Sequence, residues 1–117
     1  MDEAIFIRPD EGERIGSHRV LGELPHVEAI ELVYGADFEG VDPHTHTDHT
    51  DSFYVLEGEI EFFFDGEWHR TGPGAFVSVP PNVPHGFRPA GGNFRVLNFH
   101  TPNVGFVGRL RRHYAAV

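Results

Sequence analysis

The stretch HTHTDHTDSFYVLEGEIEF, from His44 to Phe62, contains the patterns that decide the fold. Its second half is rich in aromatic and β-branched residues, meets a turn at Glu57-Gly58, and then alternates apolar with acidic side chains. Such alternation is typical of a β-strand with one buried face. An Asp-Gly pair follows at positions 65–66 and is a strong hairpin signal. The sequence therefore predicts successive antiparallel strands in this region.

Short strands are also expected on both sides of this stretch, because 14 glycines and 9 prolines break the chain into short runs. The candidate strands are residues 4–8, 26–34, 75–79, 85–88 and 94–100. Only residues 103–117 have helical spacing, with apolar side chains on one stripe: Val104, Val107, Leu110 and Tyr114. Many short strands predict an antiparallel sandwich, jelly roll or closed barrel. A chain of 117 residues fits one domain, residues 1–117.

The composition restricts the chemistry that the chain can perform. It contains no cysteine and, in the sequence as printed, no lysine, so all nine basic side chains are arginines. Thiolate nucleophiles, cysteine-ligated zinc, Schiff-base lysines and the P-loop lysine are therefore excluded. Any chemistry must use histidines, carboxylates, hydroxyls or a bound metal.

The net charge of -9 is unevenly distributed along the chain. Residues 20–69 contain thirteen acids and no arginine, whereas residues 70–117 contain six arginines and no acid. Such asymmetry can indicate a basic tail that binds nucleic acid. The arginines are mostly isolated, however, so we interpret the asymmetry as two halves of one domain that neutralise each other. No nucleic-acid partner is expected.

Histidines are frequent, with nine in the chain and three between residues 44 and 49. Alternate side chains of an extended chain share a face, so His44 and His46 can present two imidazoles to one ion. His85 follows a proline-rich segment and is a candidate third ligand. His49 could be a fourth, but its parity is opposite, so we expect it beside the ligands or in a loop. The histidines at 18, 26, 69 and 113 are expected at the surface.

Two motifs resemble those of the cupins, a family of small β-barrel proteins. The first family motif is G-x5-H-x-H-x(3,4)-E-x6-G, and residues 44–58 match it with Asp51 in place of glutamate. The second is G-x5-P-x-G-x2-H-x3-N, and Gly74, Pro80 and His85 match its spacing. The resemblance covers about residues 35–100. The segment SFYVLEGEIEF is typical of single-domain, quercetinase-like members.

The chain departs from the family pattern at several positions. Phe38 replaces the leading glycine of the first motif, and Asn82 and Pro89 replace a glycine and the terminal asparagine of the second. Asparagine tolerates a left-handed backbone, so Asn82 can preserve the turn. Asp51 is shorter than glutamate by about 1.5 Å. Either the backbone moves inward, or Asp51 ligates through water, or the site has three histidines.

The resemblance implies an all-β fold, a cupin jelly-roll β-barrel (double-stranded β-helix) with a short C-terminal helix. Its first motif would lie at about residues 40–58 and its second at about residues 74–89. It implies one divalent transition metal per chain, Fe, Mn, Ni, Cu or Zn, held by His44, His46, Asp51 and His85. Phenylalanines that otherwise form core would wall an apolar pocket over the metal. With one polar neighbour, these pocket candidates are Phe53, Phe62, Phe64, Phe76, Phe87 and Asn98.

Two properties of the C-terminal and N-terminal strands bear on catalysis and assembly. His100 shares parity with Asn98, so it is a candidate catalytic residue if that face lines the barrel interior. The alternative is a hydrogen-bonded histidine at the barrel rim.

Ile5, Phe6 and Ile7 suit pairing with a second barrel, and the resemblance implies a homodimer. A cytoplasmic location without a membrane partner is expected, because the chain has no signal peptide and no apolar run of ~20 residues.

The resemblance and the predicted site point to a metal-dependent oxygenase acting on a small oxygenated or aromatic compound. A site with three imidazoles keeps open positions for substrate or dioxygen. A metal-assisted isomerase or epimerase is the first alternative and would use His100 as general base. A non-enzymatic module that binds a small molecule is the second.

Overall fold

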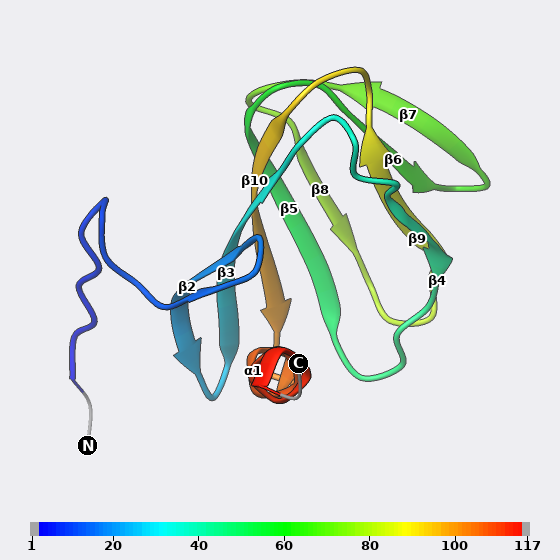
Figure 1. The fold of residues 1–117 in the computed structure, drawn as a ribbon. Coiled ribbons are helices and arrows are strands. Elements are labelled where there is room, and N and C mark those ends of the chain that lie inside the picture. Colours follow the sequence, from blue (N-terminus) through cyan, green and yellow to red (C-terminus); the bar gives the residue numbers. More distant parts are fainter. Residues whose placement is uncertain (1–2, 116–117) are drawn as a thin grey trace.

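The computed structural model describes residues 3–115, which form two antiparallel sheets and a C-terminal helix (Figure 1). The larger sheet has the order β1 (Arg14–Ile15), β2 (His18–Leu24), β3 (Val27–Tyr34), β10 (Phe94–Thr101), β5 (Thr50–Glu57) and β8 (Phe76–Val79). The smaller sheet has the order β4 (Val41–His44), β9 (His85–Pro89), β6 (Ile60–Phe64) and β7 (Glu67–Thr71). Helix α1 (Phe106–Ala115) follows β10. The all-β jelly roll with a short C-terminal helix is thus confirmed.

The turns around β6 form as the sequence predicts. Asp65 and Gly66 both have positive φ, 52° and 82°, as a two-residue hairpin turn with matching twist requires. Asn82 has φ 70°, which confirms that it takes the left-handed conformation. Residues 116–117 of the predicted helix lie outside the described residues. Within residues 3–115, no helix has the length and apolar character needed to cross a bilayer.

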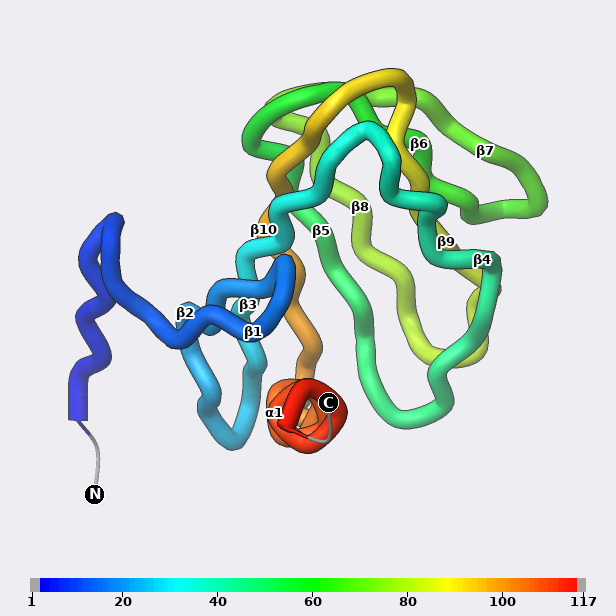
Figure 2. The backbone as a smooth tube through the Cα atoms, in the orientation of Figure 1, coloured from blue at the N-terminus to red at the C-terminus, as the bar shows by residue number. Residues whose placement is uncertain are grey.

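The prediction of a strand at residues 4–8 is wrong. This segment is irregular, and it runs along the outside of the molecule in Figures 1 and 2. Ile5, Phe6 and Ile7 are exposed, with Phe6 at 73%. Their side chains favour a strand, but a strand also needs a pairing partner, and none of the described strands lies beside them. The strands β1, β2 and β4 were not predicted, because their sequences lack clear alternation.

The interior of the barrel has an apolar end and a polar end. On β3, β5 and β9 the inward side chains change from polar to apolar along the chain, and on the antiparallel β10 they change from apolar to polar. The buried apolar positions of these strands are Ile30, Leu32, Phe53, Val55, Phe87, Phe94 and Val96. The buried polar positions on the same faces are Glu28, Asp51, His85, Asn98 and His100. The core therefore occupies one end, and the other end is left for a polar site.

Ion pairs join the acidic and the arginine-rich parts of the sequence. Arg70 pairs with Glu59 at 3.1 Å, and Arg88 pairs with Glu61 at 2.9 Å. Arg111, on α1, contacts both Glu13 and Glu23. These pairs confirm that the two halves of the chain interleave and neutralise each other.

Candidate metal centre

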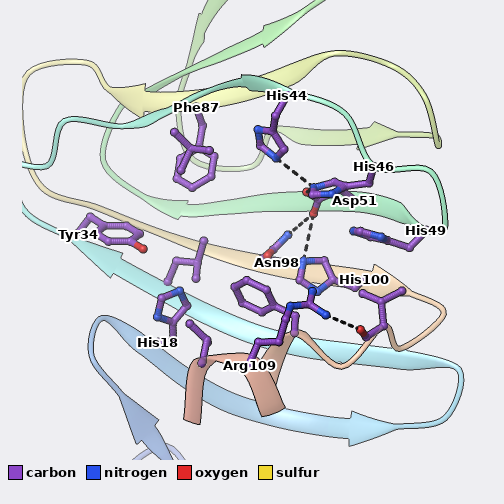
Figure 3. A pocket seen from close by; sticks show the side chains of 15 residues that line it. His18, Tyr34, His44, His46, His49, Asp51, Phe87, Asn98, His100 and Arg109 are labelled. Atoms are coloured by element: carbon purple, nitrogen blue, oxygen red, sulfur yellow. Dashed lines mark hydrogen bonds and ion pairs between the residues drawn. The ribbon is translucent and has the colours of Figure 1, made fainter. Parts of the chain in front are cut away.

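The polar end of the barrel gathers side chains from both sheets (Figure 3). His44 on β4 lies opposite His85 on β9, and Asp51 on β5 lies opposite His100 on β10. His46 lies in the loop that follows β4. The ligand nitrogens of His44, His46 and His85 lie within 4.8 Å of one another. The structure therefore brings together the three imidazoles that the sequence pattern singled out.

Close pairing of β4 with β9 depends on Gly86. A Cβ atom at this position would collide with the carbonyl oxygen of Val41. Only glycine allows the two backbones to approach so closely. The pairing places His44 directly opposite His85, so a residue without a side chain sets the spacing of two candidate ligands.

Backbone carbonyls determine how two of the imidazoles present their nitrogens. The Nδ1 of His44 lies 2.8 Å from the carbonyl of Asp42, and the Nδ1 of His85 lies 2.9 Å from the carbonyl of Val83. A carbonyl can only accept, so in both rings Nδ1 carries the hydrogen and donates it. The Nε2 lone pairs of the neutral rings are consequently directed into the cluster, as in metal-ligating histidines.

His46 completes the imidazole cluster. Its Nε2 lies 3.0 Å from the Nε2 of His44. Burial, followed by the neighbouring imidazoles of His49 and His44, lowers the pKa of His46 to about 4. A metal ligand must be neutral, so a histidine that resists protonation is well suited to the role.

Asp51 is buried between the imidazoles and β10. Its Oδ2 lies 3.0 Å from the Nε2 of His85 and 3.7 Å from that of His46, and its Oδ1 accepts a hydrogen bond of 2.6 Å from Asn98. Burial alone would raise the pKa of Asp51, but the interactions with His85, His100 and Asn98 outweigh it and lower the pKa. The shorter acid therefore reaches the cluster and stays ionised there.

His49 lies beside the imidazole cluster, in the loop before β5. It is buried, with its ring centroid 4.3 Å from that of His46 and 5.0 Å from that of His100. Its Nδ1 donates to Asp48 at 2.8 Å, and it forms a second potential ligand group with His46 and Asp51. His49 lies in the loop between β4 and β5, beside the candidate ligands, as the sequence analysis expected, and alternation does not apply in this loop because it is not an extended strand.

His100 lies on the inner face of β10 between two carboxylates. Its Nδ1 is 3.3 Å from Oε1 of Glu28, and its Nε2 is 3.6 Å from Oδ1 of Asp51. Burial lowers the pKa of His100 although both carboxylates act in the opposite direction. The ring is buried and faces the cavity described next.

A cavity of about 230 Å³ opens beside these side chains. Three of the predicted site residues outside the metal set line it, namely Phe87, Asn98 and His100. The other predicted pocket residues lie elsewhere: Phe53 and Phe62 are in the core, and Phe64 and Phe76 border a separate hollow. Phe76 is 61% exposed, because β8 is an edge strand and this residue points outward. Of the five phenylalanines predicted to wall the pocket, Phe87 is therefore the one that lines this cavity.

Side chains that sequence reasoning did not assign to a pocket form its remaining wall. Tyr34 on β3 and Arg109 on α1 line the cavity, as does His18 on β2, which was expected at the surface. His18 is buried, and its Nδ1 donates to the carbonyl of Ile15 at 3.1 Å. It could not be found from the sequence because β2 itself was not predicted. The wall is otherwise apolar: Leu32, Val41, Val104, Phe106 and Leu110.

The metal-free protein is expected to lose stability as the pH falls from about 7 to about 5. Burial lowers the pKa of His18, His46 and His100. The unfolded chain takes up protons near about pH 6.5 and these folded imidazoles do so only at lower pH, so acid favours unfolding. His85 opposes this trend, since Asp51 outweighs burial and raises its pKa.

Urea denaturation in EDTA at the two pH values measures this effect. We expect a loss of roughly 1–2 kcal/mol, with the contribution of the half-buried His46 reduced by solvent screening. His18→Gln should make the loss smaller. Equal or greater stability at the acid pH would contradict the assignment of lowered pKa values.

A family model described as "Cupin domain" matches residues 30–100. The quercetin 2,3-dioxygenase of Bacillus subtilis (strain 168) is 31% identical over 85 residues, which are 67% of this chain and 25% of that protein. The chain thus spans a quarter of the length of this curated relative.

Solved structures resemble the chain over most of its length. KdgF from Halomonas sp. superposes with a TM-score of 0.75 at 21% identity, covering 86% of this chain and 94% of that one. An RmlC-like cupin family protein with a double-stranded β-helix fold, from Methanocaldococcus jannaschii, gives 0.65 at 18% identity, covering 92% and 97%. At these identities the two structures establish the fold.

Proposed function

This chain belongs to the cupin domain family, and from that premise we propose that it is a metal-dependent oxygenase acting on a small oxygenated or aromatic compound. The observation that carries the proposal is the convergence of imidazole nitrogens at one end of an apolar cavity. The Nδ1 hydrogens of His44 and His85 are taken by backbone carbonyls, so their Nε2 lone pairs are left to a ligand. Asp51 adds an ionised carboxylate to the same cluster.

The donor set fits a divalent first-row transition metal. Imidazole nitrogens suit Fe, Mn, Ni, Cu and Zn, and one carboxylate adds charge compensation. His44, His46 and His85 would hold the ion, with Asp51 as fourth ligand. When bound, the ion would supply Lewis-acid chemistry and, if redox-active, reactivity with dioxygen. Asn98 holds Asp51 at 2.6 Å and so orients the carboxylate toward the imidazoles.

The cavity favours a small substrate with an apolar body. Its volume of about 230 Å³ lies below the ~300–1,000 Å³ that is typical of sites for drug-sized ligands. Phe87, Tyr34 and Phe106 would contact an aromatic or aliphatic part and exclude water, while the polar end would receive an oxygen substituent. The similarity to a quercetin dioxygenase supports an oxygen-dependent reaction. Because the chain covers only a quarter of that protein, its activity and substrate belong to the proposal.

Proton transfer in an isomerase or epimerase is the second candidate function, and the placement of His100 favours it. The imidazole faces the cavity, and Glu28 accepts its Nδ1 hydrogen, which leaves Nε2 as the basic nitrogen. A base so oriented could take a proton from a bound substrate.

Oxygen uptake separates the two functions. The metal-free protein is reconstituted with Fe²⁺, Mn²⁺, Ni²⁺ or Cu²⁺ and tested with flavonols, diketones and thiols in an oxygen electrode. We expect uptake that requires both the metal and one substrate class. If no combination consumes oxygen, the oxygenase proposal is wrong. Isomer formation that stops in His100→Ala, with metal content retained, would then support proton transfer.

A further inference from the structure

Glu28 carries a fully buried carboxylate that belongs neither to the imidazole cluster nor to the cavity lining. It lies on the inner face of β3. Its Oε1 accepts from the Nδ1 of His100 at 3.3 Å and from the amide of Val104 at 3.2 Å. Its Oε2 accepts from the amide of Val107 at 2.9 Å. One side chain thus binds an imidazole of the site and the N-terminus of α1.

The sheet register extends this contact toward the candidate ligands. Glu28, His100 and Asp51 are direct cross-strand neighbours on β3, β10 and β5. The Nε2 of His100 is 3.6 Å from Asp51, and Asp51 is 3.0 Å from His85. A continuous row of polar groups therefore leads from the first turn of α1 to the imidazole cluster.

We infer that Glu28 is a positioning residue that couples helix α1 to the imidazole of His100. By accepting the Nδ1 hydrogen it directs the Nε2 of His100 toward Asp51 and the cavity. By accepting amide hydrogens it holds the first turn of α1 over the same cavity. The consequence for a reacting ligand rests on the proposed function, whereas the coupling itself requires neither metal nor substrate.

The chemistry of the contacts requires a carboxylate. The hydrogen-bond partners of Glu28 are N–H donors, namely the ring of His100 and the amides of Val104 and Val107. Only an ionised acid offers acceptors on both oxygens. Burial would raise the pKa of Glu28, but the hydrogen bonds from the α1 amides and from His100 outweigh it and lower the pKa. A buried carboxylate is tolerated when it is hydrogen-bonded in this way.

Helix α1 contributes directly to the walls of the site. Phe106 and Leu110 line the cavity, and the ring of Phe106 packs edge-on against His100 with centroids 4.9 Å apart. Val107 is the helix residue that is fully buried in the core. A shift of α1 therefore changes the cavity wall and, through Glu28, the orientation of His100.

Glu28→Gln tests this inference, because the amide keeps the shape but must place an NH₂ group against N–H donors. The readouts are the ring-nitrogen chemical shifts of His100, which report its tautomer, and the amide exchange rate of Val107, both in the metal-free protein. We expect the tautomer to change or the exchange rate to rise at least about tenfold. If neither moves, the inference is overturned.

A matched control and a second variant complete the test. Glu31→Gln makes the same substitution on the opposite face of β3, where the acid pairs with Arg19 and Arg95, and should leave both readouts unchanged. Identical changes in this control would overturn the inference. Val107→Ala keeps Glu28 but loosens α1, and it should alter the His100 shifts as the helix amides exchange faster. Faster exchange with unaltered His100 shifts would overturn the coupling, because Glu28 would then act only as a cap of α1. The Val107→Ala variant tests the coupling even if Glu28→Gln does not fold.

The outcome is independent of the proposed function. All measurements are made without metal or substrate, so failure of the coupling leaves the metal proposal intact. Conversely, absence of oxygen uptake leaves the coupling intact.

Discussion

His85→Ala is expected to abolish stoichiometric binding of a divalent transition metal, with affinity weakened by more than about 100-fold. His85 contributes an Nε2 whose lone pair is directed inward by the hydrogen bond from Nδ1 to Val83. It also contacts Asp51, so its loss removes one ligand and releases another from its partner. Loss of an outer partner of a ligand alone costs about 10–100-fold in affinity, and loss of a ligand should cost more.

Calorimetric titration of the metal-free protein with Zn²⁺ or Ni²⁺, combined with elemental analysis, measures this effect. His26→Ala is the matched control, since it removes an exposed imidazole from the turn between β2 and β3. It should bind metal as the wild type does. Wild-type affinity in His85→Ala, or an equal loss in His26→Ala, would show that the cluster is not the binding site.

Asp51→Asn is expected to weaken metal binding by about 10–100-fold for a carboxylate that acts through its partners, and by more for one that ligates the ion directly. The substitution keeps the size of the side chain and removes the charge that compensates a divalent ion. It also places an amide where Asp51 now accepts from Asn98 and contacts His85. The carboxylate thus has two roles, as a charge and as an acceptor, and both are lost.

This titration is best made at about pH 8, well above the ordinary pKa of histidine. Asp51 raises the pKa of His85 against the effect of burial, so at lower pH its removal would also reduce competition by protons. Asp10→Asn, on an exposed acid of the N-terminal segment, serves as control and should bind normally. Unchanged affinity in Asp51→Asn would mean that the three imidazoles suffice without the carboxylate.

Much of the fold follows from local patterns. The strands around residues 52–71 and the strands that begin at His85 and Phe94 form close to their predicted limits. Asn82 adopts the left-handed turn expected of it. Strands with weak alternation, β2 and β4 among them, could not be found, because tertiary pairing rather than side-chain pattern stabilises them.

The candidate ligands were accessible to sequence reasoning for a similar reason. His44 and His46 are two residues apart, and Gly74, Pro80 and His85 match the spacing of the second cupin motif, so the pattern and the resemblance together mark them. His49 lies beside the candidate ligands in the loop before β5, as expected, but its burial there could not be predicted, because parity holds only in an extended chain. Burial of Asp51 among donors could not be read from its spacing.

Periodicity predicted short antiparallel strands, and the two cupin-like motifs marked the barrel and its three imidazoles, since each of these patterns involves residues near one another along the chain. The surroundings of the site depended on folding. Which phenylalanines face the cavity, how His18 and α1 close it, and why Glu28 lies against His100 all follow from contacts between distant segments. Glu28 and His100 are 72 residues apart, and only the pairing of β3 with β10 makes them neighbours.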